Sequence, residues 1–435
     1  MKILKSLLVL LFLCSLLPEK SAAQAPDAKL AARIDEYFTA LTRLKKFNGG
    51  IYVQANGHDV LKKAYNLSAD PKSSLRVSNS SQFDIHSISK LMAYSILVKL
   101  QQQHQVKLTD TLSRYLPQFP NSRLITIDQL LHHRSGLPRE LTSKPENILA
   151  LSPDQIIAAI SKEKLEFAPG TDTRYSNLGY EVIYYLIQKI TGKPFAQCVK
   201  TYIFDPLQMK ASGAHFVISH ANLKQPALNH QLRDGVLTRV PNITQDEFST
   251  ARIYSTLGDM MVYLKSLHRE PYLSALRDTL GVIQKNGGSD GIRAQIYTQT
   301  TKHYSFVLFA NDDDIPFQQT ITDLVNILEG KPYQVPAEIN RKAVPVADNI
   351  LQRYTGSYDF AEANHTRLEF RVENGLLQLY QDNKKEASLS AENERVFFDD
   401  PKSADGFEFI QQGDGWQISW TYQGSKFKGL KVTTP

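Results

Sequence analysis

Residues 83–97, FDIHSISKLMAYSIL, combine an apolar helical pattern with a serine and a lysine three positions apart. A helix that is apolar on nearly all sides is buried in a core. Ser87 opens this helix at the positive end of its dipole, and Lys90 shares its face. A buried lysine has a lowered pKa and can take the proton of a serine nucleophile. The alternative is that Ser87 only caps the helix while the Lys90 amine reaches solvent.

The spacing Ser-x-x-Lys alone identifies nothing, because it occurs three times in the chain. Ser161 and Lys164 lie in a charged run, and Ser425 and Lys428 lie in a turn of the last 90 residues. Both of these pairs are expected on the surface. The context of Ser87 singles it out.

A second candidate motif is Tyr175-Ser176-Asn177, which comes just before a helical pattern. A phenol on a loop can relay a proton between a serine and a leaving group, and an amide can hold a lysine and a substrate carbonyl. The alternative is a packed loop tyrosine, with Asn177 as a helix cap.

A third candidate is Lys285-Asn286-Gly287-Gly288, which we expect at the end of a strand. A lysine there can bind a substrate carboxylate. The N–H groups of Gly288 and Ser87 can form an oxyanion hole. The alternative is an ordinary Asn-Gly-Gly turn.

Strand patterns at both ends of residues 24–330 enclose a helical middle. Residues 51–55 and 60–65 form a hairpin pattern around Asn56-Gly57. Further strand patterns cover 281–284, 292–297 and 304–310, and the helical patterns are 88–103, 125–132 and 177–191. This order predicts an α+β domain, with an antiparallel sheet flanked by helices and a helical subdomain.

The chain changes character after a linker predicted at residues 331–347, which is rich in proline and charge. Residues 348–435 show strand patterns alone, with hairpin cues at Asn374-Gly375 and Gly413-Asp414-Gly415. Trp416 and Trp420 are spaced to share one face of a strand. We expect a small β-sandwich or barrel without catalytic residues.

The three motifs, in this order, resemble the serine β-lactamase and penicillin-binding-protein superfamily. The resemblance is to the branch of class C β-lactamases, D-alanyl-D-alanine carboxypeptidases and esterases. Residues 126–137, TIDQLLHHRSGL, and 204–209, FDPLQM, are similar to further landmarks of that branch. The tail from about residue 350 resembles the lipocalin-like β domain that often follows this hydrolase domain.

The resemblance implies a role for each motif residue. Ser87 would be the acylated nucleophile, Lys90 its proton acceptor and Tyr175 the general acid/base. The remaining residues would bind substrate (Asn177, Lys285, Asn286 and Gly287) or supply oxyanion-hole amides (Ser87 and Gly288).

Three positions depart from the family pattern. Asn286 replaces the hydroxyl residue of Lys-Thr-Gly, which argues against recognition of a β-lactam carboxylate. Ala251-Arg252 stands where two glycines are common, so Arg252 would narrow the cleft or add a cation to it. His86 precedes the nucleophile in place of a small residue, either packed in the core or touching the cleft.

Composition excludes several classes of protein. The 435 residues are 42% hydrophobic and carry a net charge of +6, which is too small and too scattered for nucleic-acid binding.

Residues 1–23 read as a secretory signal peptide, with a retained membrane anchor as the alternative. Cys14 would leave with this peptide, so Cys198 has no cysteine to pair with.

We therefore predict a serine hydrolase, secreted or periplasmic in a bacterium, that cleaves an amide or ester through an acyl-enzyme. Its substrate would be a D-amino-acid peptide, a β-lactam or a small ester, and the sequence assigns no oligomeric state. No cofactor or metal is expected, because the adjacent His132 and His133 point about 100° apart on a helix. The mature chain should contain no membrane span. The alternative is a non-catalytic protein that binds or senses cell-wall peptides.

Overall fold

The computed structural model describes residues 24–214, 223–233, 236–242, 248, 250–363, 365–413 and 415–432. Its main sheet is antiparallel, in the order β2-β1-β10-β9-β8. The strands are β1 (Gly49–Ala55), β2 (His58–Tyr65), β8 (Val282–Ser289), β9 (Ile292–Gln299) and β10 (Tyr304–Ala310). Ile51 of β1 lies opposite Leu308 of β10. The predicted α+β class, with the sheet joining distant segments, is confirmed.

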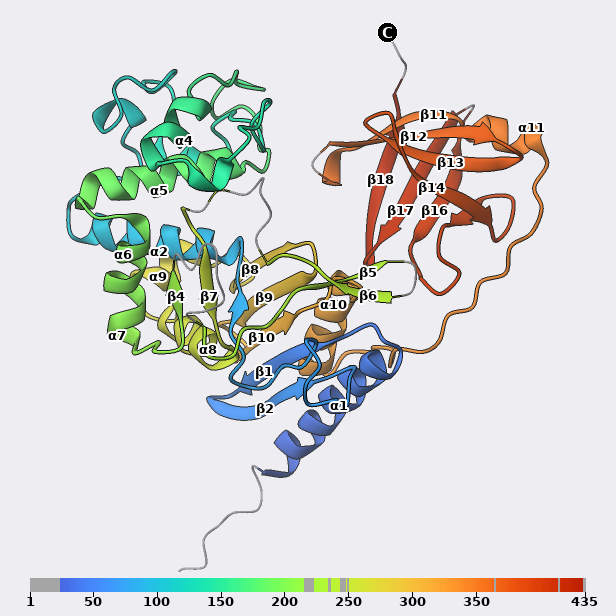
Figure 1. The fold of residues 1–435 in the computed structure, drawn as a ribbon, viewed down its shortest axis with the longest axis horizontal. Coiled ribbons are helices and arrows are strands. Elements are labelled where there is room, and N and C mark those ends of the chain that lie inside the picture. The colour runs from blue at the N-terminus through green and yellow to red at the C-terminus, as the bar shows by residue number, and fades with distance from the viewer. Residues whose placement is uncertain are drawn as a thin grey trace, which may run out of the picture.

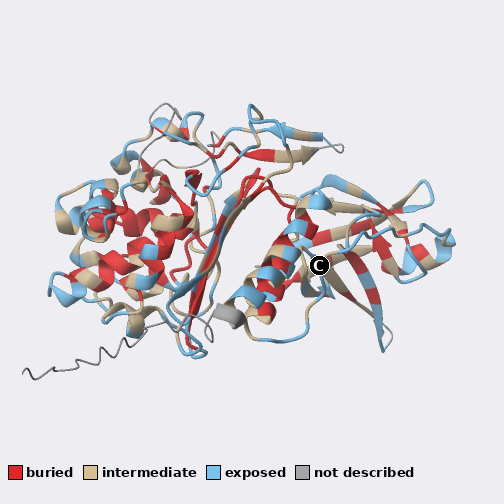
Figure 2. Ribbon diagram, turned by 90° about the horizontal axis from the view of Figure 1, so that it is seen from below, coloured by how far each residue is buried: buried red, intermediate tan, exposed pale blue. Residues whose placement is uncertain are grey.

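The central strands are buried on both faces because apolar residues occupy both sides of the pleat. In β1, Ile51 and Val53 belong to one core, whereas Tyr52 between them belongs to the other. In β10, Phe306 belongs to the same core as Ile51, and Val307 belongs to the same core as Tyr52. The sheet is therefore the middle layer of three, and Figure 2 shows its buried strands between helices.

The helix pair α1 (Gln24–Arg43) and α10 (Phe317–Leu328) covers one face, while α2 (Ile88–Gln102) and α8 (Leu257–Ser266) pack on the other (Figure 1). Helix α2 is buried on nearly all sides, as predicted. Helix α5 (Asn177–Thr191) packs on α2, and α3 (Ile127–Leu131) and α4 (Pro153–Ile160) pack on α5. These helices form the subdomain above the sheet.

Shorter elements complete this domain. The helices are α6 (Phe195–Val199), α7 (Asp205–Leu207) and α9 (Tyr272–Leu276). A three-stranded sheet joins β3 (Phe83–Asp84), β7 (Ile253–Ser255) and β4 (Gly213–Ala214), and a two-stranded sheet joins β5 (His230–Arg233) and β6 (Val236–Arg239). Strand β3 leads directly into α2 and so places Ser87 at the junction.

The C-terminal region is a closed barrel of eight strands, β11–β18, preceded by α11 (Asp348–Leu351). Its core is aromatic: the Phe409 ring lies 4.1 Å from the Tyr354 ring and 5.4 Å from the Phe370 ring. The strands are β11 (Gly356–Phe360), β12 (Thr366–Glu373), β13 (Leu376–Gln381), β14 (Lys384–Ala391), β15 (Val396–Phe398), β16 (Gly406–Gln412), β17 (Gly415–Tyr422) and β18 (Ser425–Lys431).

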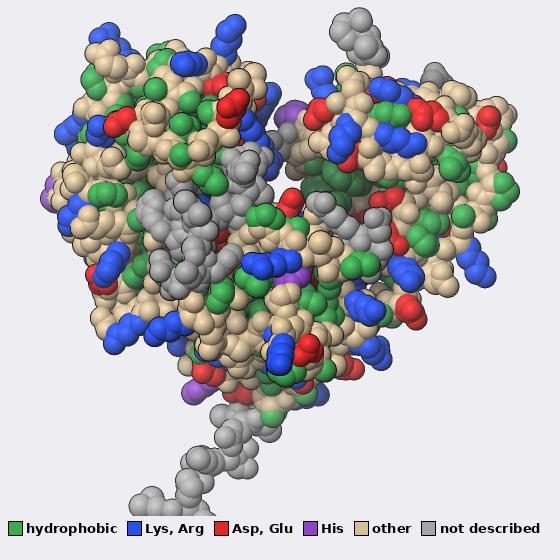
Figure 3. Space-filling view, in the orientation of Figure 1, with side chains coloured by type: hydrophobic (Ala, Val, Ile, Leu, Met, Phe, Trp, Pro, Cys, Tyr) green, Lys and Arg blue, Asp and Glu red, His purple; other side chains and the backbone are tan. Residues whose placement is uncertain are grey.

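Both predicted hairpin turns lie between paired strands of this barrel, although Asp414 of the second turn lies outside the described residues. The barrel touches the first domain where the Gln319 N–H donates to the Gln423 carbonyl at 3.0 Å. On the face drawn in Figure 3, basic and acidic side chains intermix over both domains. The boundary at residues 331–347 stays a prediction.

No helix in the described part of the chain is long and apolar enough to span a bilayer. The predicted signal peptide, residues 1–23, and Cys14 within it lie outside the described residues. Cys198 is a buried free thiol.

Glu329, directly after α10, supports a prediction about acid stability. Its carboxylate binds the amines of Lys302 and Lys331 at 2.7 Å each, and these cations lower its pKa to about 2. A lowered pKa contributes stability above the unfolded value of about 4.3, and this stability is lost as pH falls towards 2. Glu329→Gln should therefore lower the free energy of unfolding by about 1 to 2 kcal/mol at pH 7 and by less at pH 3.

Denaturant titrations at the two pH values measure this difference. Glu338→Gln, at an exposed position of the same segment, is the control and should change neither value. Equal stability of Glu329→Gln and the parent protein at pH 7 would contradict the assigned role of the carboxylate.

Candidate active site

The Ser87 hydroxyl lies between the Lys90 amine and the Tyr175 hydroxyl. Lys90 Nζ donates to Ser87 Oγ at 3.0 Å, and the Tyr175 hydroxyl is 2.9 Å from the same oxygen. Ser87 directly precedes α2 and Lys90 lies in its first turn, whereas Tyr175 comes from the loop before α5. The structure thus brings together three of the residues that the sequence singled out.

This arrangement differs from the simple helix cap that the sequence left open. The Ser87 side chain makes no capping hydrogen bond to α2. Lys90 is only 6% exposed, so its amine does not extend into solvent. Both side chains are directed at each other instead.

Two lysines change the electrostatics around Tyr175. Burial alone would raise the pKa of the phenol, but the charges of Lys90 and Lys285, together with hydrogen bonds from Ser87 and Lys90, lower it. The two amines lie 5.3 and 5.5 Å from the ring centroid. Burial likewise lowers the pKa of Lys285. Both shifts favour the deprotonated form, that of the Tyr175 phenol and that of the Lys285 amine.

His133 packs beside this centre and was not predicted there. Its ring lies 4.5 Å from the Tyr175 ring. Burial, followed by the charges of Lys285 and Lys90, lowers the pKa of His133 to about 3. The imidazole is therefore neutral, and its Nδ1 accepts the Ser176 N–H at 3.2 Å. It positions the loop that carries Tyr175.

Strand β8 passes close to the nucleophile. The tetrapeptide 285–288 lies inside β8, which continues to Ser289, rather than at its end as predicted. The strand continues because Ser289 still pairs with Ile292 of β9. A Cβ on Gly287 would lie 2.3 Å from the Ile85 oxygen and 3.0 Å from the Ser87 nitrogen. Only glycine lets the strand approach Ser87 this closely.

Gly287→Ala should therefore displace β8 from Ser87. A displacement of about 1 Å costs on the order of 10²-fold in rate, so we expect kcat/KM for an ester to fall by about that factor. Gly415→Ala is the matched control, because the nearest atom to its Cβ would be 3.8 Å away. Parental activity in Gly287→Ala would contradict the close approach.

A cavity of about 340 Å³ opens beside Ser87. Its lining includes Ser87, Lys90, Asn177 and Gly288, together with the acidic residues Glu140, Glu181 and Asp290. Asn177 is the first residue of α5, where the Ser176 hydroxyl caps the helix by accepting the Gly179 N–H at 2.9 Å. The Asn177 amide donates to Glu140. That this amide also holds Lys90 and a substrate carbonyl stays a prediction.

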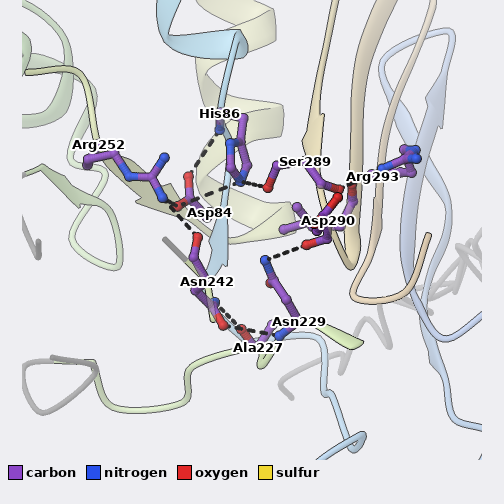
Figure 4. A network of polar contacts seen from close by, with 10 residues as sticks. Asp84, His86, Ala227, Asn229, Asn242, Arg252, Ser289, Asp290 and Arg293 are labelled. Atoms are coloured by element: carbon purple, nitrogen blue, oxygen red, sulfur yellow. Dashed lines mark hydrogen bonds and ion pairs between the residues drawn. The ribbon is translucent and has the colours of Figure 1, made fainter. Parts of the chain in front are cut away.

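The two departures from the family pattern, His86 and Arg252, lie together at the cavity wall (Figure 4). Arg252 is buried and lies 3.0 Å from the Asp84 carboxylate, which balances its charge. Asp84 also accepts the His86 N–H at 3.1 Å. The His86 imidazole is 3.2 Å from Ser289 Oγ and is 5% exposed. His86 is thus both packed and in contact with the cleft.

The hydrogen bonds of Arg252 also reach a segment that is distant in sequence from His86. Arg252 donates to the Asn242 carbonyl at 2.8 Å, and the Asn242 amide donates to Ala227 at 2.9 Å (Figure 4). His86 has a φ of 44°, which is unusual for a residue other than glycine. The surrounding bonds hold this strained residue directly before Ser87.

Asn286, the third departure, is exposed on β8. Sequence reasoning missed Asp84, Glu140 and Glu181 as parts of the site. Of these three, Glu181 could have been predicted from the sequence, because it lies four residues after Asn177 and so on the same face of α5. Partners of Arg252 and Asn177 are set by tertiary contacts that no spacing encodes.

Comparison with known proteins identifies the family of the chain. A family profile described as Beta-lactamase matches residues 34–309. The teichoic acid D-alanine hydrolase of Staphylococcus aureus (strain MRSA252) is 28% identical over 214 residues, which cover 49% of this chain and 52% of that protein. The chain spans 61% and 52% of the length of the first two curated relatives that it matches.

Solved structures share the fold. FmtA from Staphylococcus aureus aligns with a TM-score of 0.58 at 23% identity, over 72% of this chain and 90% of that one. The octameric penicillin-binding protein homologue from Pyrococcus abyssi aligns with a TM-score of 0.58 at 18% identity, over 93% and 99%. The profile match covers more than half of the sequence, and the chain therefore belongs to the Beta-lactamase family.

Proposed function

We propose that this chain is an exported serine hydrolase that cleaves an ester or amide through an acyl-enzyme on Ser87. The observation that carries the proposal is the placement of Lys90 Nζ at 3.0 Å and the Tyr175 hydroxyl at 2.9 Å from Ser87 Oγ. One serine oxygen thus has both a proton acceptor and a proton relay within hydrogen-bond distance.

In the acylation step, Ser87 Oγ bonds to the substrate carbonyl carbon and its proton passes to Lys90 Nζ. The N–H groups of Ser87 and Gly288 stabilise the oxyanion. Collapse of this intermediate breaks the bond to the leaving group, which takes a proton from the Tyr175 hydroxyl. Lys90 then returns a proton to the phenolate, so that the serine proton ends on the leaving group.

Deacylation runs through the same groups in reverse. Water attacks the acyl carbon as Tyr175 and Lys90 accept its proton, and the bond to Ser87 Oγ breaks when that proton returns to the serine. The acid product leaves and the free enzyme is restored. No cofactor enters either step.

The substrate classes that we propose are D-aminoacyl esters or amides, β-lactams and small esters. The curated relative named teichoic acid D-alanine hydrolase supports the first class. Asn286 argues against efficient β-lactam hydrolysis, because its exposed amide occupies the position where the family pattern has a hydroxyl. We propose that Lys285, whose Nζ lies 5.5 Å from the Tyr175 ring centroid, binds a substrate carboxylate.

The departure at Asn286 also favours a second candidate function, a binding or sensing protein that does not turn substrate over. A panel of D-alanine methyl ester, a peptide ending in D-alanyl-D-alanine and a chromogenic cephalosporin separates the two. The hydrolase proposal expects many equivalents of product per protein from the ester. At most one equivalent of product from every compound would support the binding protein.

A further inference from the structure

The strongest feature that the reaction above does not use is the carboxyl group of Glu181. Glu181 lies on α5 one turn after Asn177, lines the same cavity as Ser87 and Lys90, and is 8% exposed. The Thr250 hydroxyl donates to this carboxyl group. Its Oε2 atom is buried and accepts no hydrogen bond from the described residues.

Burial of a carboxylate is unfavourable when one of its oxygens accepts no hydrogen bond. Burial is the main cause that raises the pKa of Glu181 to about 7. Such a group is stabilised by a cation that enters the site and donates hydrogen bonds to it. The cavity therefore has an acceptor for a positively charged group.

The cations of the protein around the cavity already have other positions. Lys90 donates to Ser87 Oγ, and Arg252 pairs with Asp84. Lys144 is an exposed residue at the rim. Of the other acidic residues in the lining, Glu140 accepts the Asn177 amide, and Asp290 follows the exposed end of β8. Among these carboxylates, Glu181 is buried and has one oxygen that accepts no hydrogen bond from the described residues.

The position of the cavity indicates which part of a substrate it receives. The leaving group must lie next to the Tyr175 hydroxyl that protonates it, and Tyr175 and Lys285 are not part of the cavity lining. The carbonyl oxygen must point between the Ser87 and Gly288 amides. The remaining substituent of the carbonyl carbon, the acyl group, is then directed into the cavity.

We propose that the cavity selects acyl groups that carry a free amine, and that Glu181 binds this amine as an ammonium ion. The substrate class is thereby narrowed to aminoacyl esters or amides with an unblocked amino group. This inference rests on the proposed acyl-enzyme function. In this proposal Glu181 determines substrate specificity and takes no part in the proton transfers.

The test compares methyl esters that differ only in the amine: D-alanine against propionate, and β-alanine against its N-acetyl derivative. We expect the parent protein to prefer at least one free-amine ester by about 10- to 100-fold in kcat/KM, the range of a hydrogen-bonded charge. Glu181→Gln should reduce that ratio towards one. Glu36→Gln, an exposed site on α1, should retain it.

The outcomes separate the two proposals. A parent protein that takes a fluorophosphonate adduct and hydrolyses charged and uncharged esters equally well overturns the inference but not the hydrolase. A preference that persists unchanged in Glu181→Gln also overturns it. A protein that forms no adduct and hydrolyses none of the four esters overturns the proposed function itself. The ratio in the parent protein is informative even if Glu181→Gln does not fold.

Discussion

Ser87→Ala is expected to reduce ester turnover to the rate of the buffer alone. The variant keeps Lys90 and Tyr175 in place but removes the oxygen that both of them contact, at 3.0 and 2.9 Å. Without that oxygen no acyl-enzyme can form, and activated-serine enzymes lose about 10⁶-fold in kcat when the nucleophile is removed. Product release from D-alanine methyl ester, followed to many turnovers, measures the loss.

The chain contains a matched control for this substitution. Ser161 has the same spacing to Lys164, but its hydroxyl donates to the Ile157 carbonyl at 2.8 Å within a local helical turn. Ser161→Ala should therefore keep the parental rate. Appreciable turnover by purified Ser87→Ala, or an equal loss in Ser161→Ala, would contradict the assignment of Ser87 as nucleophile.

Tyr175→Phe is expected to slow turnover by roughly 10²- to 10⁴-fold, the usual contribution of a positioned acid or base. The substitution keeps the ring that packs on His133 at 4.5 Å and removes only the hydroxyl. The main effect should fall on kcat, because the proton is needed when the leaving group departs. Steady-state kinetics with two esters of different leaving-group pKa measure the loss, which should be greater for the poorer leaving group.

Tyr94→Phe serves as the comparison for Tyr175→Phe. Tyr94 also lies near the site, on α2, but its hydroxyl donates to the Ala275 carbonyl at 3.3 Å. Its loss should leave kcat within a factor of about two of the parent, since most surface and peripheral substitutions have small effects. An unchanged kcat in Tyr175→Phe would remove this phenol from the mechanism.

Much of the fold follows from local patterns in the sequence. The Asn56-Gly57 turn between two strand-like runs, 51–55 and 60–65, predicted the first hairpin, because turn chemistry is a local property. Apolar residues on nearly all sides of residues 88–97 predicted the buried helix that carries Ser87. These features depend on neighbours in sequence, so a single chain reveals them.

The contacts of the site were less predictable. The pairing of Arg252 with Asp84 and the donation of Asn177 to Glu140 join loops that are distant in sequence. The continuation of β8 through Ser289 depends on its pairing with β9, so the predicted end of that strand at Gly288 was wrong. Roles of the individual residues in catalysis stay predictions for the experiments above.

The central claim is that Ser87 is an activated nucleophile, and intact-mass measurement after exposure to a fluorophosphonate tests it most directly. In that reaction Ser87 Oγ bonds to phosphorus as fluoride leaves, so the protein gains one adduct of defined mass. The account predicts a single adduct on the parent protein and on Ser161→Ala, and none on folded Ser87→Ala. An equal adduct on Ser87→Ala, or no adduct on the folded parent protein, would contradict it.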